Sequence, residues 1–315
     1  MQDQIFITGA TGCIGHYVLD ELKQVFPNAH YHLFARRPER FKNNAPDWDN
    51  TTVYPFELNE MESVKDVLPN MDYIIHIATV WGYNLDDNIK LNRDKTLEMF
   101  NYCDPKKLKR IIYFSTASIL TANNELNEVA KTDGIPYVQS KYHAYVAIQE
   151  SKWADKIITL FPTVVLGGGN GYPISHISSG FKTIRKTMRY LKWLRLKGSF
   201  HFLHAKDIAK VTVACLNQTP STRDIVLGNP EVTFNSTIKS ICNYLKINTW
   251  FQIPLSSSLI LVVIAMFRIK VDSWARYCIK HPNFSYNVQS PEHFNLDVSY
   301  PKIEMAVGDI LNEQQ

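Results

Sequence analysis

The sequence predicts an α/β fold, in which a doubly wound parallel sheet carries a smaller, mainly helical lobe. Three observations predict it. Short runs rich in β-branched and aromatic residues alternate with segments long enough for a helix, the runs lack strict apolar–polar alternation, and the pattern loosens after residue 162. Such alternation is typical of repeated βαβ units with right-handed crossovers. Runs without polar alternation are expected where helices cover both faces of a sheet.

Eight strands follow from this pattern. Six precede residue 166, namely QIFIT (4–8), YHLFA (31–35), TVYPF (52–56), DYIIHIA (72–78), RIIYFST (110–116) and KIITLFP (156–162). The stretch FHFLHAKDIAKVTVACL predicts a strand followed by a helix that rejoins the sheet, and DIVLG (224–228) predicts a further strand. We therefore assign residues 1–166 and 201–230 to the sheet domain and residues 167–200 and 231–315 to the lobe.

Composition and charge exclude several classes of function. At 315 residues, with 45% hydrophobic and 20% charged residues, the chain has the composition of an ordinary globular protein. The formal net charge is +4, but seven of the positive residues fall in the stretch 181–197, which contains no acid. The positive charge is therefore local, which argues against a general role in nucleic-acid binding.

Cysteine and histidine usage indicates neither a disulfide framework nor a metal site. The five cysteines are scattered and form no C-x-x-C pair. His201 and His204 are three apart in a predicted strand, so their side chains point to opposite faces. No apolar signal segment precedes the strand that begins at Gln4. These features predict a cytoplasmic protein without a resident metal.

The stretch ITGATGCIG, residues 7–15, follows the first predicted strand and leads into a helix starting near Cys13. Its three glycines allow a tight turn, so the helix N-terminus can face a pyrophosphate, as in a Rossmann-type dinucleotide site. After the second strand, where NAD-binding folds place an acid, the sequence has Arg36 and Arg37. Guanidinium groups match a phosphate bidentately, which favours NADP(H), with NAD(H) as the alternative.

Ordered motifs extend beyond this turn. They are TGATGCIG, FEL (56–58), HIAT (76–79), LN (91–92), FSTAS at the end of the fifth strand, YVQSK (137–141), FPTVVLG (161–167) and FLHAKDIA (202–209). Over about residues 4–230 the sequence thereby resembles the extended branch of the short-chain dehydrogenase/reductases, the NAD-dependent epimerase/dehydratase superfamily. The resemblance implies a small-molecule substrate bound by the lobe, and a homodimer formed through the helices after the fourth and fifth strands.

The resemblance also implies a set of residues that hold the cofactor. These are Gly9, Thr11, Gly12, Cys13, Ile14, Gly15, Arg36, Arg37, Glu57, Leu58, Ile77, Ala78, Thr79, Asn92, Tyr137, Lys141, Pro162 and Val164.

Tyr137 and Lys141 lie four residues apart in a predicted helix, so both side chains project from one face. An ordinary phenol, with a pKa near 10, is a poor acid–base catalyst at neutral pH, and a nearby ammonium is expected to lower that pKa. By resemblance, Tyr137 is the general acid/base and Lys141 its partner. The hydroxyl that binds the substrate oxygen is Thr116 in our assignment, with Ser115 and Ser118 as competitors.

The end of the sixth strand separates branches of the family. The sugar-nucleotide branch commonly has an R-x-x-N-x-x-G-like pattern, but here Phe161 and Val164 occupy the Arg and Asn positions. The sequence is more similar to the hydroxysteroid dehydrogenase and dihydroflavonol reductase branch, which predicts an oxidoreductase interconverting a carbonyl and an alcohol. A nucleotide-sugar epimerase/dehydratase and a non-catalytic NADP(H)-binding sensor are the alternatives. Trp81, Tyr83 and Ser118 are the candidate substrate contacts.

Two segments suggest a lipophilic substrate and a peripheral membrane contact. The segment SLILVVIAMF (258–267) is strongly apolar but too short to span a bilayer. FKTIRKTMRYLKWLRLK (181–197) has Phe181, Ile184, Met188 and Leu191 along one helical side and basic residues mostly on another. The favoured interpretation of the first segment is a buried helix of the lobe, and the alternative hypothesis is that both segments dock on anionic lipid and admit a lipophilic substrate.

Overall fold

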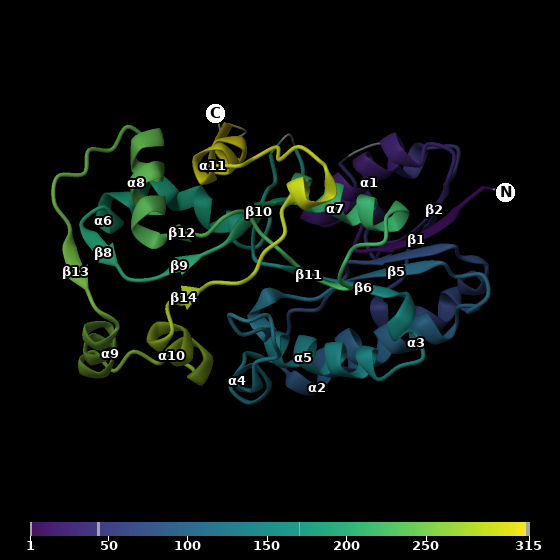
Figure 1. Cartoon of the computed structure of the whole chain (residues 1–315), viewed down its shortest axis with the longest axis horizontal. Helices are drawn as coiled ribbons and strands as arrows, with labels where there is room; N and C mark the ends of the chain where they lie inside the picture. Colours follow the sequence, from purple (N-terminus) through teal and green to yellow (C-terminus); the bar gives the residue numbers. More distant parts are fainter. Residues whose placement is uncertain (1, 43–44, 170, 313–315) are drawn as a thin grey trace.

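Seven parallel strands form the main sheet, in the spatial order β11-β6-β5-β4-β1-β2-β3 (Figure 1). The protein is described here by a computed structural model that covers residues 2–42, 45–169 and 171–312. The bounds of the strands are β1 (Gln4–Thr8), β2 (His30–Phe34), β3 (Thr51–Tyr54), β4 (Tyr73–His76), β5 (Arg110–Phe114), β6 (Ile157–Pro162) and β11 (Asp224–Leu227). The strand order reverses between β1 and β4, which is where doubly wound sheets bind ligands.

The predicted fold class is confirmed, and each predicted strand of the main sheet is present with ends that shift by no more than two residues. The strands β4 and β5 end two residues earlier than predicted. Ile77 and Ser115 each donate one further hydrogen bond to the neighbouring strand, to the carbonyl oxygens of Thr8 at 3.2 Å and Leu160 at 2.8 Å, and with Ala78 and Thr116 they line a cavity.

Helices cover both faces of the sheet, as its strands without polar alternation require. The helices α1 (Cys13–Val25) and α7 (Ala205–Asn217) pack on one face, and α3 (Lys95–Asn101) and α5 (Pro136–Gln149) on the other (Figure 1). The short helices α2 (Leu85–Ile89) and α4 (Glu128–Thr132) contact α5. Helix α5 begins at Pro136, whose fixed φ suits the first helical position.

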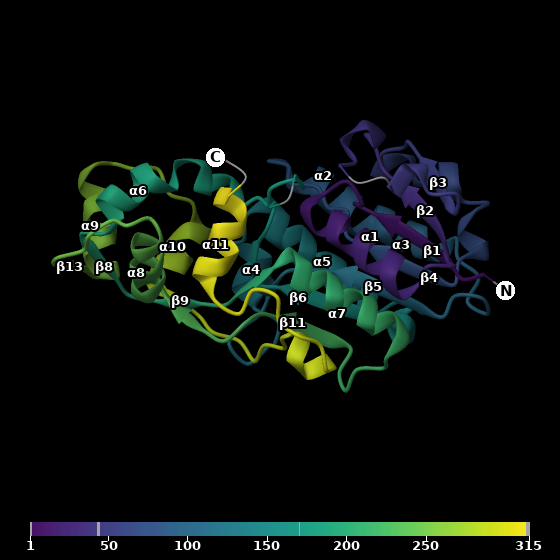
Figure 2. The same ribbon diagram turned by 90° about the horizontal axis from the view of Figure 1, so that it is seen from above.

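The lobe lies at the opposite end of the molecule from the N-terminus (Figure 2). Its helices are α6 (Ile184–Leu191), α8 (Phe234–Tyr244), α9 (Ser257–Met266), α10 (Ser273–Lys280) and α11 (Ile303–Asn312). Its short strands are β8 (Leu194–Leu196), β9 (Ser199–Phe200), β12 (Val232–Thr233), β13 (Ile253–Leu255) and β14 (Asn283–Phe284). A separate apolar core unites α6, α8 and α11 through side chains such as Met188, Ile241 and Val307.

One prediction about this region is confirmed and another is wrong in detail. The strand before α7, β10 (Phe202–His204), pairs with β7 (Val164–Leu166), and the helix α7 rejoins the main sheet by packing on it, as predicted. The basic stretch is helical only to Leu191, because its later residues pair as β8 with β13 and Trp193 accepts a hydrogen bond of 2.8 Å from Ile253 N–H. Tertiary pairing thus overrides the helical periodicity. The side chains of Phe181 and Lys182 lie outside the described part of the chain.

The C-terminal stretch returns to the sheet domain before it enters the lobe. Phe294 packs into the core between α1 and α7. The fully buried carboxylate of Asp207 in α7 accepts hydrogen bonds from Ser299 N–H at 2.7 Å and Tyr300 N–H at 3.0 Å. These contacts fix the segment that leads into α11, so the two parts of the molecule interleave along the sequence.

Asp207→Asn is expected to lower the free energy of unfolding by about 2 kcal/mol, because the amide nitrogen would face a backbone N–H donor that only an acceptor satisfies. Urea denaturation followed by tryptophan fluorescence measures the change. The matched control is Asp66→Asn at an exposed position, for which we expect no change. An unchanged midpoint for Asp207→Asn would show that this carboxylate does not hold the segment.

Candidate active site

The glycine turn brings the backbones of β1 and β4 together where the strand order reverses. Gly9 has a φ of +76°, and a Cβ at this position would lie 2.6 Å from the Ala78 amide nitrogen. A Cβ on Gly15 would lie 2.3 Å from the carbonyl oxygen of Gly9. Both positions therefore exclude any side chain, and α1 starts directly beneath the turn.

The N-terminus of α1 is suited to an anion. Its N-cap residue, Gly12, offers no side chain to satisfy the free N–H groups, and the first turn contains no acidic residue. The partial positive charge of the helix end is therefore not neutralised locally. Together with the close approach at Gly9, this arrangement fits the pyrophosphate of a dinucleotide.

A cavity of about 1170 Å³ extends from this turn to helix α10 in the lobe. Ligand pockets for one small molecule are usually about 300–1,000 Å³ in volume. The cavity is therefore large enough for a dinucleotide and a substrate together. One half is formed by the carboxyl ends of β1, β2, β4 and β5, and the other by residues around α10 and the segment 283–286.

Most residues predicted to hold the cofactor line this cavity. They are Gly9, Thr11, Gly12, Cys13, Ile14, Arg36, Glu57, Leu58, Ile77, Ala78, Thr79, Tyr137, Lys141, Pro162 and Val164. Arg36 lies 3.7 Å from Glu57 in an ion pair between two half-exposed side chains. Burial raises the pKa of the Cys13 thiol to about 12, so this cysteine stays protonated near neutral pH.

Three predicted residues stand outside the cavity lining. Gly15 packs beneath Gly9. The exposed Arg37 is not among the lining residues, whereas Arg40, three residues on, is. Asn92 is buried, and its amide bonds Thr79, both backbone groups of Val80 and the Ser140 hydroxyl. The Asn92 amide therefore positions the segment after β4 and does not line the cavity itself.

The helix α5 brings Tyr137 and Lys141 to the end of β5. The Lys141 Nζ donates a hydrogen bond of 2.7 Å to the carbonyl oxygen of Phe114 and lies 4.9 Å from the centre of the Tyr113 ring. Burial lowers the pKa of Lys141 to about 7. The chain thus places an amine that can exchange its proton near neutral pH beside the phenol.

The expected lowering of the Tyr137 pKa is not found in the protein alone. Burial raises the pKa of the Tyr137 phenol, and a hydrogen bond with the Thr116 hydroxyl opposes this rise only in part. The physical reason is that Lys141 is itself buried and directed at the carbonyl oxygen of Phe114, so its charge is disfavoured. The phenol is consequently held protonated, ready to donate.

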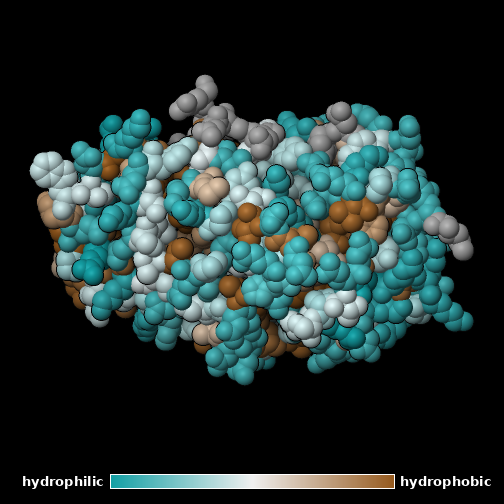
Figure 3. All heavy atoms as spheres, turned by 45° about the horizontal axis from the view of Figure 1, so that its top comes forward, coloured by the Kyte–Doolittle hydropathy of each residue, from teal (hydrophilic) through white to brown (hydrophobic). Residues whose placement is uncertain are grey.

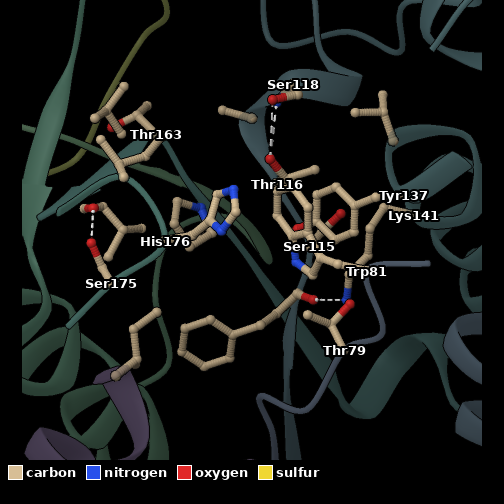
Figure 4. Close-up of a pocket in the computed structure, with 18 of the residues that line it drawn as sticks. Thr79, Trp81, Ser115, Thr116, Ser118, Tyr137, Lys141, Thr163, Ser175 and His176 are labelled. Atoms are coloured by element: carbon tan, nitrogen blue, oxygen red, sulfur yellow. Dashed lines mark hydrogen bonds between the residues drawn. The ribbon is translucent and has the colours of Figure 1, made fainter. Parts of the chain in front are cut away.

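The three competing hydroxyls occupy different environments. Thr116 donates to the Ser118 hydroxyl at 3.2 Å and accepts from the Ser118 N–H at 3.3 Å, and it is the one of the three that interacts with Tyr137 (Figure 4). The Ser115 hydroxyl is buried and has no hydrogen-bond partner within the described residues. All three residues line the cavity.

Trp81 stacks on the catalytic candidate. Its ring centre lies 3.8 Å from that of Tyr137 with an interplanar angle of 14°, and His176 approaches Trp81 from the other side at 4.8 Å (Figure 4). Trp81 is 52% exposed. Tyr83, the other predicted aromatic contact, is fully exposed and does not line the cavity, because its side chain points to solvent.

Sequence reasoning missed several lining residues. These are Arg40, His176 with its neighbours Ile174, Ser175 and Ile177, the sheet-domain residue His201, and the lobe residues Phe200, Phe234, Trp274, Tyr277, Cys278, His281, Asn283, Phe284, Ser285 and Tyr286. Arg40 could have been found, since it belongs to the basic run after the second strand. The lobe residues follow no motif.

A model of the NAD dependent epimerase/dehydratase family matches residues 5–228. The chain belongs to this family. As a member, it is an NAD(P)-dependent enzyme of the extended short-chain dehydrogenase/reductase type, and the predicted resemblance is confirmed. None of the curated proteins matches it in sequence.

Solved structures of similar fold align over nearly the whole length of this chain. The crystal structure of gox2253 has a TM-score of 0.75 at 16% identity, covering 99% of this chain and 97% of its own. A UDP-N-acetylglucosamine 4-epimerase from Methanobrevibacter ruminantium M1, in complex with UDP-N-acetylmuramic acid, has a TM-score of 0.68 at 16% identity, with both chains covered at 100%.

A third structure, the dTDP-glucose 4,6-dehydratase from Bacillus anthracis str. Ames in complex with NAD, has a TM-score of 0.66 at 13% identity. It covers 98% of this chain and 96% of its own. At such identities the likeness establishes the fold, and the reaction has to be argued from the site itself.

The described residues contain no group of three or more His, Cys, Asp or Glu side chains arranged to hold a metal ion. Among the described helices, none has the length and apolar character needed to cross a bilayer.

The stability of the protein is expected to depend on the Lys141 amine. Since its pKa is lowered in the folded state, the unfolded chain binds more protons between about pH 7 and about pH 10. Stability relative to Lys141→Met should therefore rise with pH across this window, at up to about 1.4 kcal/mol per pH unit. Urea denaturation of both proteins at pH 6, 8 and 10 measures the difference. A difference that does not change with pH would contradict the burial of a titrating amine.

Proposed function

We propose that this enzyme is an NADP(H)-dependent oxidoreductase that interconverts a carbonyl and an alcohol on a lipophilic organic substrate. The observation that carries the proposal is the composition of the cavity wall. Within the described residues, its lysine and arginine side chains are Arg36, Arg40 and Lys141, all in the half formed by the sheet. The lobe half has none.

The lobe half is instead mainly aromatic. Its lining includes Phe200, Phe234, Trp274, Tyr277, Phe284 and Tyr286. Two of the polar side chains there are already engaged, the first being His201, which contacts the Asn229 carbonyl oxygen at 2.8 Å and accepts a hydrogen bond from Tyr286 N–H at 3.1 Å. Asn127 donates to the Tyr277 hydroxyl at 3.1 Å. Such a wall stabilises an apolar, uncharged ligand.

The alternative is a nucleotide-sugar epimerase or dehydratase, which the family and structures such as the UDP-N-acetylglucosamine 4-epimerase support. A nucleotide sugar carries a diphosphate, whose burial is costly without cations or many N–H donors. The lobe half of the cavity offers no lysine or arginine for this purpose among its described residues. Val164, in place of an asparagine, removes a further polar contact. The non-catalytic alternative is disfavoured by the intact pair of Tyr137 and Lys141.

The chemistry follows from the side chains at the end of β5. A carbonyl oxygen placed against Thr116 and Tyr137 would accept a hydrogen bond from the hydroxyl and a proton from the phenol. When bound, the nicotinamide cofactor supplies the hydride that reaches the carbonyl carbon. When the Tyr137 hydroxyl has given up its proton, Lys141 stabilises the resulting phenolate and can return a proton to it. In the reverse direction the same phenolate takes the proton of the alcohol.

Purified protein is expected to oxidise NADPH in the presence of lipophilic ketones or aldehydes, and Tyr137→Phe should lower kcat by about 10²- to 10⁴-fold because the proton donor is lost. Absorbance at the NADPH band measures turnover. The affinity for NADPH, measured by fluorescence titration, should change little, since the phenol acts in the chemical step.

The matched control is Tyr145→Phe on the same helix. The Tyr145 hydroxyl donates a hydrogen bond of 2.7 Å to Asp224, and Tyr145 does not line the cavity. It should keep turnover near that of the wild type. Conversion of UDP- or dTDP-sugars, with no reduction of any lipophilic carbonyl, would replace this proposal by the epimerase/dehydratase alternative.

The preference for NADP(H) over NAD(H) is part of the proposal. Arg36 and Arg40 both line the cavity, and Arg36 pairs with Glu57, where the resemblance places the adenosine half of the cofactor. Two guanidinium groups at this point favour a 2′-phosphate. The homodimer and the cytoplasmic location remain predictions.

Arg36→Ala and Arg40→Ala are each expected to weaken NADPH binding by about 10- to 100-fold, with little change for NADH, because each removes a charged hydrogen-bond donor. Fluorescence titration with both nucleotides measures the effect. Arg37→Ala serves as the control, since this exposed side chain does not line the cavity. Tighter binding of NADH than of NADPH by the wild type would reverse the assignment.

A further inference from the structure

Exposed apolar side chains are concentrated at one end of the lobe. Fifteen large hydrophobic side chains are exposed in the described chain, and eight of them fall within residues 250–269. These are Trp250 (83%), Phe251 (61%), Ile253 (54%), Leu259 (45%), Val262 (54%), Met266 (70%), Phe267 (69%) and Ile269 (51%). We call this set the apolar end.

The apolar end forms one continuous region of the fold. It comprises the segment before β13, the strand β13 and the helix α9, which both ribbon views place at the extreme of the lobe (Figures 1 and 2). Phe251 packs on Trp193 with ring centres 4.9 Å apart, and β13 pairs with β8. Hydrophobic surface is visible at this end beside hydrophilic surface (Figure 3). Patches of this kind mark interaction sites.

The segments that build this end contain no acid. No Asp or Glu occurs in residues 156–206 or in residues 232–271. Exposed basic side chains surround the apolar end, namely Arg185, Lys186 and Arg189 on α6, Arg195 on β8, and Lys246, Arg268 and Lys270. A hollow after α9 is lined by Arg268, Lys270 and Arg276, with Asp272 engaged in capping α10.

The apolar end is adjacent to the cavity. Helix α9 contacts α10, and α10 contributes Trp274, Tyr277 and Cys278 to the lobe half of the cavity. A surface that contacts α9 is therefore next to the aromatic wall that receives the substrate.

We propose that the apolar end docks this enzyme on an anionic membrane surface, from which a lipophilic substrate reaches the cavity past α10. The docking itself does not depend on the proposed function, whereas the delivery of substrate rests on it. Aromatic and aliphatic side chains insert at the level of the headgroups, and the basic side chains around them neutralise anionic lipid.

Charge decides between the possible occupants. A second copy of this chain would bring the same basic, acid-free surface against itself, which is repulsive in a symmetric contact. An anionic bilayer offers apolar depth and negative charge together. Because α9 has ten residues, it can lie in the interface but cannot span it.

Flotation of the full chain with vesicles tests the docking without any measurement of turnover. The protein is expected to float with vesicles of phosphatidylcholine and phosphatidylserine and to stay behind with pure phosphatidylcholine. The double variants Met266→Ser/Phe267→Ser and Arg268→Glu/Lys270→Glu should each lower the vesicle affinity by at least about tenfold. All four side chains are exposed, so folding should be retained, and circular dichroism checks this.

Two matched controls change the same residue types elsewhere. Val25→Ser/Met305→Ser removes exposed apolar side chains, and Lys106→Glu/Lys152→Glu reverses exposed charges, both away from the apolar end. Both should float as the wild type does. Equal loss in the controls, or no flotation of the wild type, would overturn the proposal. So would a dimer, seen by analytical ultracentrifugation, that Met266→Ser/Phe267→Ser dissociates.

The substrate route is tested separately. Anionic vesicles should lower the KM for a membrane-dissolved ketone in the wild type but not in Met266→Ser/Phe267→Ser, while the KM for a water-soluble ketone stays the same in both. Flotation with no ketone turnover would leave the docking intact and refute the proposed reaction. A KM that vesicles do not change would refute the delivery of substrate past α10.

Discussion

The site depends on the contact between Gly9 and Ala78. The backbone at Gly9 lies so close to the backbone at Ala78 that a Cβ on Gly9 would come within 2.6 Å of the Ala78 amide nitrogen. This contact brings the ends of β1 and β4 together where the strand order reverses. The N-terminus of α1 and the residues after β4 thereby face one cavity. Asn92 then holds the chain after β4 by bonding both backbone groups of Val80, which places Trp81 on Tyr137. A tight turn at one end of the sheet thus determines what can lie over the phenol.

The electrostatics of the site follow from burial. In water, a lysine near a tyrosine would favour the phenolate. Here both groups are buried, so the charged form of each is disfavoured and the pair rests near neutrality. The Phe114 carbonyl oxygen holds the amine in place without compensating a full charge. A positive charge or an oxyanion that entered this site would therefore change the balance between the two groups strongly, since little solvent is present to screen it.

The sequence could predict the parts of the site that local patterns encode. The strands follow from β-branched and aromatic runs, and the turn follows from its glycines. The spacing of four residues predicts that Tyr137 and Lys141 share a helix face, and the resemblance to the family supplies their role. The parts that depend on packing between distant segments could not be predicted. Arg40 replaces Arg37 at the cavity because the short turn after Pro38 reorients the chain. The aromatic wall comes from residues after 270, which are brought to the sheet by tertiary contacts alone.

The basic stretch illustrates the same limit. Its apolar residues do recur at helical spacing, and Ile184 and Met188 are buried as that spacing indicates. Beyond Leu191, however, pairing with a strand about sixty residues later, β13, decides the backbone. A pattern within one segment cannot contain that partner. Tyr83 was misassigned for a related reason, because closeness to Trp81 in sequence says nothing about the side of the chain on which it projects.

The interleaved path of the chain has a consequence for folding during synthesis. The main sheet is complete once β11 has been made, whereas the core of the lobe combines residues of α6 and α8 with Val307 and Ile310 of α11. A nascent chain can therefore form the sheet and its helices early, but the apolar faces of α6 and α8 stay uncovered until the last helix leaves the ribosome. During that interval these faces are the surfaces that a chaperone would have to protect.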